Sequence, residues 1–249
     1  MVILKLPDEI EKARASNRIV AEVLSKLREK VKPGVKTREL DKFAEEVTEK
    51  RGAKPAFKGY RGYPYSLCTS VNEQVVHGMP SERVLVEGDI IGIDFGVYHR
   101  GFYGDATITL PVGKVNEKAL RLMQVTEQSL YAGIEQAKSG NRLGDISAAV
   151  QGTVEAAGFS IVRDFVGHGV GKNLHEDPQI PNSGKKGRGV ELKTGMILAI
   201  EPMVNEGGYK VRILPDGWTV ITEDGSLSAH FEHSVAITDN GPEILSKLN

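Results

Sequence analysis

A β-branched, apolar run at residues 90–110, IIGIDFGVYHRGFYGDATITL, predicts two buried strands joined as a hairpin. A two-residue loop at His99–Arg100 would place Asp94 and Asp105 directly opposite each other, on the same side of the sheet. Like charges directly opposite destabilise a sheet, and a buried ionised carboxylate costs several kcal/mol unless it is paired or bound to a metal. The pattern therefore predicts a cation between the two aspartates.

Start and stop signals predict four helices. Proline and acidic residues occupy the first turn of the first segment, and a glycine closes each segment, as is usual at helix ends. The predicted helices span residues 7–34, 37–53, 116–140 and 144–159. Two helices therefore precede the hairpin and two follow it.

The chain also repeats itself. An offset of 106 residues aligns Gly34 with Gly140 and Gly52 with Gly158. An offset of 107 places GDIIGID, which ends at Asp94, over GMILAIE, which ends at Glu201. Matches at nearly the same offset in helices and in a strand indicate two related halves that share one sheet. We expect a single domain over 1–249, with halves at about 8–112 and 116–249.

The second half supplies further acids on strands. Glu201 ends the apolar run MILAIE, and the following proline suits a strand end. In SAHFEHSVAIT, residues 228–238, polar and apolar positions alternate, so that His230, Glu232 and Ser234 share one face. Each half thus offers two acids, Asp94 and Asp105 in the first and Glu201 and Glu232 in the second.

A histidine between glycines indicates the kind of cation. His168 lies in GHG, where the glycines allow the backbone to enter a crowded site. The same region lacks the glycine and hydroxyl spacing of a phosphate-binding loop, and the chain has no HExxH motif. Four carboxylates and an imidazole suit a pair of divalent transition ions better than one calcium, which prefers oxygen ligands only. Two such ions, ~3.5–4 Å apart, can ionise a bridging water and polarise a carbonyl.

Composition limits the partners and the cellular compartment that we expect for this protein. The chain has 249 residues and a net charge of −1, from 32 Lys+Arg against 33 Asp+Glu, so nothing suggests nucleic-acid binding. No run approaches the ~20 apolar residues of a membrane span, and the N-terminus lacks a signal-peptide pattern. The single cysteine, Cys68, fits a reducing compartment. We expect a cytoplasmic protein with no membrane or nucleic-acid partner.

These residues resemble the methionine aminopeptidases. The resemblance rests on TSVNEQVVHGMP, GHGVG, LHEDPQIPN, AIEPMV and FEHSVAIT, together with the order and spacing of the acids and histidine, and it covers essentially the whole chain. It implies an α+β, pita-bread fold, in which pseudo-twofold helix–helix–strand halves share a curved antiparallel sheet. Only 33 positions separate His168 from Glu201, which is similar to the short bacterial type I form.

The resemblance also implies site residues. The metal ligands would be Asp94, Asp105, His168, Glu201 and Glu232. Asp94 would chelate one ion, Asp105 and Glu232 would bridge both, and His168 and Glu201 would complete the other site. Glu201 would also accept a proton from the attacking water, while His175 would bind the scissile amide or its oxyanion and His77 would position the peptide and assist proton transfer. The substrate-binding residues would be Tyr60, Tyr63, Cys68, Leu174 and Trp218, with His77 and His175.

Two positions depart from the pattern of relatives. Leu174 stands where some relatives carry an aromatic residue, and Gly96 where others often carry threonine. These differences affect the shape of the pocket and one contact to a ligand or water. His99, His230 and His233 are assigned structural roles.

The implied activity is removal of the N-terminal methionine from nascent polypeptides near the ribosome, by a monomer holding two divalent ions. Co, Mn, Fe and Zn all suit the ligand set. One alternative is an Xaa-Pro aminopeptidase or dipeptidase of the same fold, which usually carries a large N-terminal domain. Another is a binding protein of that fold that has lost catalysis, although such proteins drop ligands and all five are present here.

Overall fold

The computed structural model describes residues 2–248. Within that range the chain forms four α-helices, and none of them is long and apolar enough to cross a membrane. The helices are α1 (Pro7–Lys30), α2 (Thr37–Lys50), α3 (Glu117–Gln136) and α4 (Leu143–Ala156). Each ends three or four residues before the last residue of the predicted segment, so the four predicted helices are confirmed with shorter C-terminal ends. The offset of 106 residues relates both bounds of α2 to those of α4.

The strands are short except for the central hairpin. In the first half they are β1 (Lys54–Pro55), β2 (Cys68–Val71), β3 (Gln74–Val76), β4 (Ile90–His99) and β5 (Phe102–Pro111), and a 3-10 turn, η1, covers Tyr60–Gly62. In the second half they are β6 (Ser160–Ile161), β7 (Val166–Gly169), β8 (Glu176–Pro181), β9 (Ile197–Ile200), β10 (Met203–Asn205), β11 (Val211–Ile213), β12 (Val220–Thr222), β13 (Ser228–His230), β14 (Glu232–Thr238) and β15 (Gly241–Ile244).

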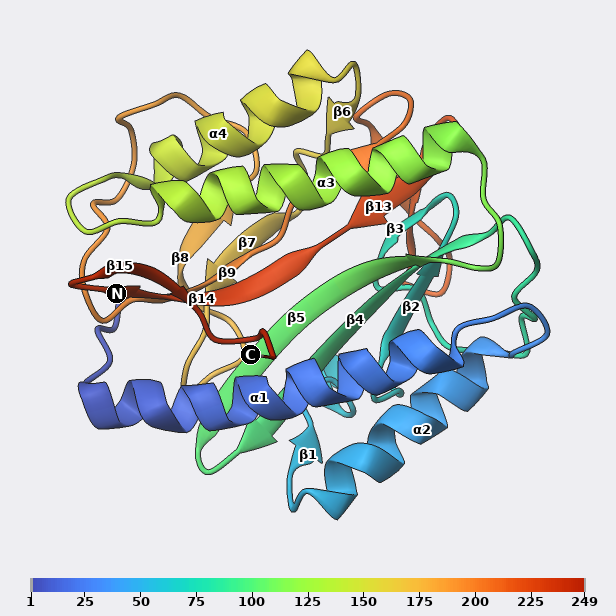
Figure 1. Ribbon diagram of the computed structural model, residues 1–249, viewed down its shortest axis with the longest axis horizontal. Coiled ribbons are helices and arrows are strands. Elements are labelled where there is room, and N and C mark those ends of the chain that lie inside the picture. The colour runs from blue at the N-terminus through green and yellow to red at the C-terminus, as the bar shows by residue number, and fades with distance from the viewer. Residues whose placement is uncertain (1, 249) are drawn as a thin grey trace.

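One large antiparallel sheet joins the two halves of the chain. Its order is β1-β4-β5-β14-β9-β7-β8, with β2 also paired to β4 and β15 to β14. Two three-stranded sheets, β13-β10-β6 and β11-β12-β3, lie beside it. In Figure 1, α1 and α2 lie along the part of this sheet that contains β4 and β5, and α3 and α4 along the part that contains β7, β8 and β9.

Each helix pair covers its own apolar core. Under α1 and α2 the core includes Leu24, Leu40 and Phe95, all at most 4% exposed. Under α3 and α4 it includes Leu122, Ile146 and Leu198.

The halves meet in the large sheet at β5 and β14, where the ladder has only two residue pairs, Glu232 with Thr107 and His233 with Ala106. Within the large sheet, the two halves therefore meet along a short seam.

The central hairpin is confirmed, but its predicted register was wrong. The loop is Arg100–Gly101 rather than His99–Arg100, so Asp94 pairs with Thr107 and Asp105 with Gly96. Both loop residues have positive φ, 50° for Arg100 and 85° for Gly101, as the favoured two-residue hairpin turns of type I′ require. Moving the loop by one residue shifts the pairing by two, which leaves both aspartates on the same face. They are diagonal neighbours on that face.

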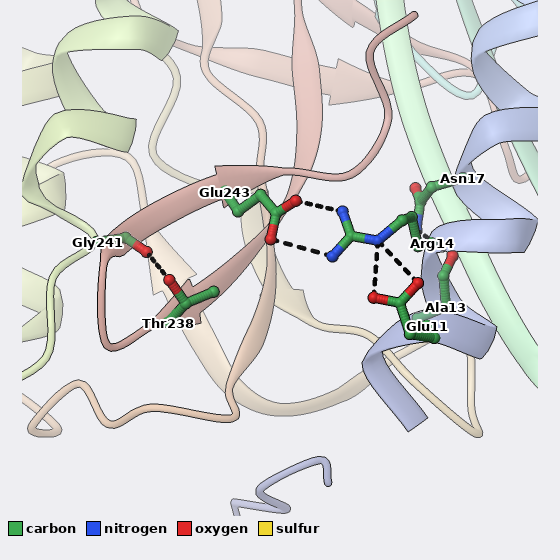
Figure 2. A network of polar contacts seen from close by, with 7 residues as sticks. All are labelled: Glu11, Ala13, Arg14, Asn17, Thr238, Gly241 and Glu243. Atoms are coloured by element: carbon green, nitrogen blue, oxygen red, sulfur yellow. Dashed lines mark hydrogen bonds and ion pairs between the residues drawn. The ribbon is translucent and has the colours of Figure 1, made fainter. Parts of the chain in front are cut away.

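Side chains of α1 fasten the N-terminal half to the end of the chain. Figure 2 shows the Arg14 guanidinium facing both carboxylate oxygens of Glu243 on β15. Glu11, one turn earlier, accepts from Arg14 Nε at 3.2 Å. Asn17, on the same helix, accepts a hydrogen bond of 3.3 Å from the backbone amide of Asp105. Helix α1 therefore contacts the strand that carries one of the predicted ligands.

A glycine makes this approach of α1 possible. A Cβ atom at Gly104 would lie 2.7 Å from the backbone nitrogen of Asn17 and 2.9 Å from its Cα. Both atoms belong to the helix backbone, so no side-chain movement can relieve the contact. Gly104 therefore sets the distance between α1 and β5, next to Asp105.

We predict that the same substitution has opposite effects at two glycines. Gly104→Ala should destabilise the protein by about 1–3 kcal/mol, because it overpacks the contact between α1 and β5. Gly152→Ala should stabilise it by roughly 0.5–1 kcal/mol, because Gly152 is exposed within α4 and a new Cβ would meet nothing within 4 Å. Urea unfolding measures both changes. An unchanged stability in Gly104→Ala would contradict direct backbone packing at this site.

Candidate metal centre

Five adjacent strands of the large sheet each bring one predicted ligand to the same region. In sheet order, Asp94 lies on β4, Asp105 on β5, Glu232 at the start of β14, Glu201 directly after β9 and His168 on β7. The strands pair antiparallel, and Thr107 pairs with both Asp94 and Glu232. The repeat thus places acids from both halves on either side of the seam between β5 and β14.

Short contacts connect these side chains. The Thr107 hydroxyl donates to Glu232 Oε2 at 2.8 Å, and His168 Nε2 lies 3.5 Å from Glu201 Oε1. One ligand atom each from Asp105, His168 and Glu232 lie within 4.8 Å of one another. The arrangement can therefore enclose an ion among carboxylate oxygens and an imidazole nitrogen.

The electrostatics of the acids indicate that a cation is needed. Burial raises the pKa of Asp94 to about 7. Burial, and after it the charges of neighbouring carboxylates, raises the pKa values of the other three acids well above their ordinary range. These three are Asp105, Glu201 and Glu232. Without a cation the four groups cannot all be ionised near neutral pH.

Unpartnered atoms test whether the residues fit a metal. Among the described residues, Asp94 Oδ1, Asp105 Oδ1 and Glu232 Oε1 are buried without a hydrogen-bond partner. Buried polar atoms are rarely left in this state. His168 Nδ1 bonds to the Gly169 carbonyl at 2.8 Å, which requires the proton on Nδ1 and leaves Nε2 with a free lone pair. Burial lowers the pKa of His168, so its ring is neutral. The donor set fits a divalent transition ion.

All five residues line one cavity of about 260 Å³. The same cavity is lined by every residue predicted to bind substrate: Tyr60, Tyr63, Cys68, His77, Leu174, His175 and Trp218. Its apolar part is built around Tyr63 and Trp218, whose rings meet edge to face at 5.1 Å. Burial raises the pKa of the Cys68 thiol well above its usual value, so this cysteine is not an activated nucleophile. The structure therefore brings together the whole predicted set.

Two histidines lie at this cavity in distinct settings. His175 Nδ1 lies 2.9 Å from the Tyr60 hydroxyl, and its ring stacks on that of Tyr60 with the centroids 5.3 Å apart. The His168 and His175 rings are 4.2 Å apart. His77 has φ of 58°, which is uncommon for a residue with a side chain and often marks a functional site. Burial lowers the pKa of His77 to about 4, so its ring is neutral at pH 7.

The two departures from the family pattern have different structural settings. A Cβ at Gly96 would lie 2.7 Å from Phe57 Cε1 and 2.9 Å from the Cβ of Ala56. Glycine therefore makes room for Phe57, which lines the cavity. Leu174 is 1% exposed and packs in the apolar cluster that contains Tyr63 and Cys68. It forms an aliphatic wall of the pocket.

His230 lies at the cavity, although the sequence pattern was interpreted as giving it only a structural role. It lines the cavity, it is 4% exposed, and its Nε2 lies 3.7 Å from Glu201 Oε2 without a hydrogen-bond partner. The alternating pattern of residues 228–238 had already placed it on the face of Glu232, and that signal was sufficient to include it. His233, on the opposite face, bonds to Ser246 at 2.8 Å and lies outside the cavity lining.

Comparisons with known proteins agree along the whole chain. The family model described as "Metallopeptidase family M24" matches residues 11–239. A methionine aminopeptidase of Clostridium perfringens (strain 13 / Type A) is 56% identical over 248 residues, which span 100% of this chain and 100% of that relative.

Solved structures give the same result. The crystal structure of a methionine aminopeptidase from Thermotoga maritima matches with a TM-score of 0.98 and 50% identity, and the match covers 100% of both chains. A prolidase from Pyrococcus furiosus matches with a TM-score of 0.81 and 25% identity, over 99% of this chain and 66% of the prolidase. The likeness to the prolidase thus leaves a third of that protein without a counterpart.

We predict that Mn²⁺ binding to metal-free protein releases protons near pH 7. The raised pKa values mean that the acids hold protons which the metal must displace, so the apparent affinity should rise from about pH 6 to about pH 8. Calorimetric titration in two buffers of different ionisation enthalpy counts the protons. Glu223→Gln, at an exposed acid outside the cavity lining, serves as the control and should release the same number. Binding without proton release would rule out a protonated acid cluster.

Proposed function

The chain belongs to metallopeptidase family M24, and we propose that it is a methionine aminopeptidase that removes the N-terminal methionine from nascent polypeptides. The observation that carries the proposal is the convergence of four acids and a histidine, from five adjacent strands, on one cavity in a chain with full-length similarity to such enzymes. The family and the pita-bread fold predicted from the sequence are confirmed by the same similarities.

We propose that the centre holds two divalent ions. Asp94 would bind one ion, His168 and Glu201 the other, and Asp105 and Glu232 both. The unpartnered oxygens of Asp94, Asp105 and Glu232 support this assignment. When bound, the ions lower the pKa of a water molecule and polarise the carbonyl of the scissile bond. The donor types suit Co, Mn, Fe and Zn alike, because geometry and availability decide which ion occupies such a site.

The remaining side chains would orient the substrate and move protons. Glu201 would accept a proton from the attacking water, because its carboxylate lines the cavity beside the other candidate ligands, with Oε1 3.5 Å from His168 Nε2. His175, held by Tyr60, would donate a hydrogen bond to the amide or to the oxyanion that forms. Neutral His77 would position the peptide and assist proton transfer to the leaving amine.

The apolar part of the cavity suits a methionine side chain. Tyr63, Cys68 and Trp218 offer aromatic edges and a sulfur atom, which make favourable contacts with a thioether. An unbranched chain can fill this narrow space, whereas a β-branched residue is restricted at χ1. We propose that this wall selects methionine at the N-terminus.

Setting and partners follow from the same proposal. The substrates would be nascent chains near the ribosome, and the protein would act as a monomer. A single, buried cysteine is in keeping with the reducing cytoplasm.

The alternative activities are less well supported. An Xaa-Pro peptidase shares the fold, but the prolidase from Pyrococcus furiosus is only 25% identical to this chain. A binding protein without catalysis would not need the complete donor set or the neutral histidines that line the cavity. The 56% identity over the full length favours methionine release.

We predict that the protein cleaves Met-Ala-Ser and leaves Val-Ala-Ser and Ala-Pro peptides essentially intact. A chelator should abolish cleavage, and added divalent metal should restore it. Release of the first amino acid, measured by mass spectrometry, tests all three peptides in parallel. Equal cleavage of the methionine and valine peptides would refute the proposed selectivity, and activity in protein shown by elemental analysis to be metal-free would refute the metal mechanism.

We predict a contrast between two alanine variants. His175→Ala should keep its metal and lose roughly 10²–10³ in kcat, which is the scale of deleting one donor to a developing oxyanion. Glu232→Ala should lose both activity and bound metal, because it would contribute to both ions. Metal content and kcat are measured on both variants. A metal-depleted His175→Ala would show that His175 is a ligand instead.

A further inference from the structure

A lysine from the N-terminal segment is buried against Glu176, the residue that follows His175 in the chain. The Lys5 side chain is 3% exposed, and its Nζ lies 2.6 Å from Glu176 Oε2, whose side chain is 4% exposed. Lys5 Nζ also donates to the Ile3 carbonyl at 3.2 Å, and the backbone amide of Lys5 donates to Gly195 at 2.7 Å. The segment ahead of α1 is thus fixed in place with its charge directed inward.

The partner of Lys5 shapes the turn that carries His175. Glu176 Oε1 accepts a 3.0 Å hydrogen bond from the backbone amide of Asn173, which closes the turn between β7 and β8. Glu176 itself follows His175 and pairs with Gly169, the neighbour of His168. Both carboxylate oxygens of Glu176 are therefore engaged, one by the lysine and one by the turn.

The backbone of this turn packs directly on the ion pair. A Cβ at Gly171 would lie 2.5 Å from Lys5 Cε and 2.9 Å from Glu176 Oε1. The Gly171 carbonyl accepts from the Tyr103 amide at 2.8 Å, which fixes the other side of the turn. A displacement of Lys5 would therefore reach the turn through contact as well as through charge.

We propose that Lys5 is a positioning residue for the reaction: through Glu176 it holds the turn 170–175 so that His175 faces the substrate. The proposal rests on the proposed function, because it assigns a purpose to the place of His175. A misplacement of about 1 Å in a catalytic group can cost about 10²-fold in rate. The buried pair therefore contributes to kcat from the far end of the chain.

A neighbouring ion pair provides a matched control. Lys172 Nζ lies 2.6 Å from Glu9 Oε1 and connects the same turn to α1, but the Lys172 side chain is 62% exposed. Exposed pairs of this kind contribute little, since solvent screens them. Lys172→Met should therefore leave kcat, KM and metal content unchanged.

The first test compares Lys5→Met with this control in metal-loaded protein and the peptide Met-Ala-Ser. Lys5→Met should lower kcat by about 10- to 100-fold, with KM and metal content close to wild type, and Lys5→Arg should recover part of the loss. If Lys5→Met fails to fold, Glu176→Gln tests the same pair, because it keeps an acceptor for Asn173 while removing the charge. Unchanged kcat in a folded variant, or equal loss in Lys172→Met, would overturn the proposal.

The second test asks whether Lys5 acts through His175. In a His175→Ala background, Lys5→Met should produce no further loss of kcat, whereas independent effects would multiply. A multiplied loss would assign Lys5 a general structural role and overturn the proposal.

Hydrogen exchange separates failure of this proposal from failure of the proposed function. An inactive wild-type enzyme, loaded with metal, would reject the proposed function alone. In that case the amides of residues 171–176 still decide the positioning role: they should exchange faster in Lys5→Met and not in Lys172→Met. Equal protection in both variants would overturn it.

Discussion

Four carboxyl groups confined to one buried cavity are the constraint on which the rest of this structure depends. Burial removes the hydration of these acids and raises their pKa values, and at Asp105 the charges of the neighbouring carboxylates raise the pKa further. The fold must therefore hold them rigidly while leaving the side of the cluster that faces the cavity for a cation. Five adjacent strands meet this requirement, because a sheet fixes the spacing of its side chains through its hydrogen-bonded ladders.

The internal repeat provides this arrangement with few elements. Each half contributes a helix pair, its own core and two acids, so the site forms where the halves meet in the sheet. The surrounding shell then differs between the halves. Both halves contribute to the apolar wall, Tyr63 and Cys68 from the first and Leu174 and Trp218 from the second, while His168 and His175 come from the second half alone. Both halves therefore contribute to the substrate pocket and to the candidate metal centre.

Local signals made most of the fold predictable, and long-range contacts marked the limit. The helices were predictable because glycines mark their ends locally, and because the repeat relates the second helix pair to the first. The hairpin register was wrong by two residues, because it depends on which pair adopts positive φ, and Arg100–Gly101 suits this better than His99–Arg100. The placement of His230 in the cavity was missed although its face had been assigned correctly.

The ligand residues of the candidate site could be recognised from the sequence, but their individual roles could not be worked out from it. The acids stood out because carboxylates inside apolar strands require an explanation, but their roles came from resemblance to a family. The pairing of Lys5 with Glu176 could not be predicted, because the two residues are 171 positions apart and neither belongs to a periodic pattern. Contacts of this kind appear only once the chain is folded.

The short seam between β5 and β14 has a mechanical consequence. Two ladder pairs, with hydrogen bonds from Thr109 and Ser234 at either end, carry the connection between the halves within the large sheet. Asp105 on β5 and Glu232 on β14 lie on opposite sides of that seam, so an ion bound to both would connect the two strands across it. Such an ion would reinforce a joint that the β3–β12 ladder and the Arg14–Glu243 ion pair also hold, so metal binding would add to the mechanical strength of the sheet at its shortest ladder.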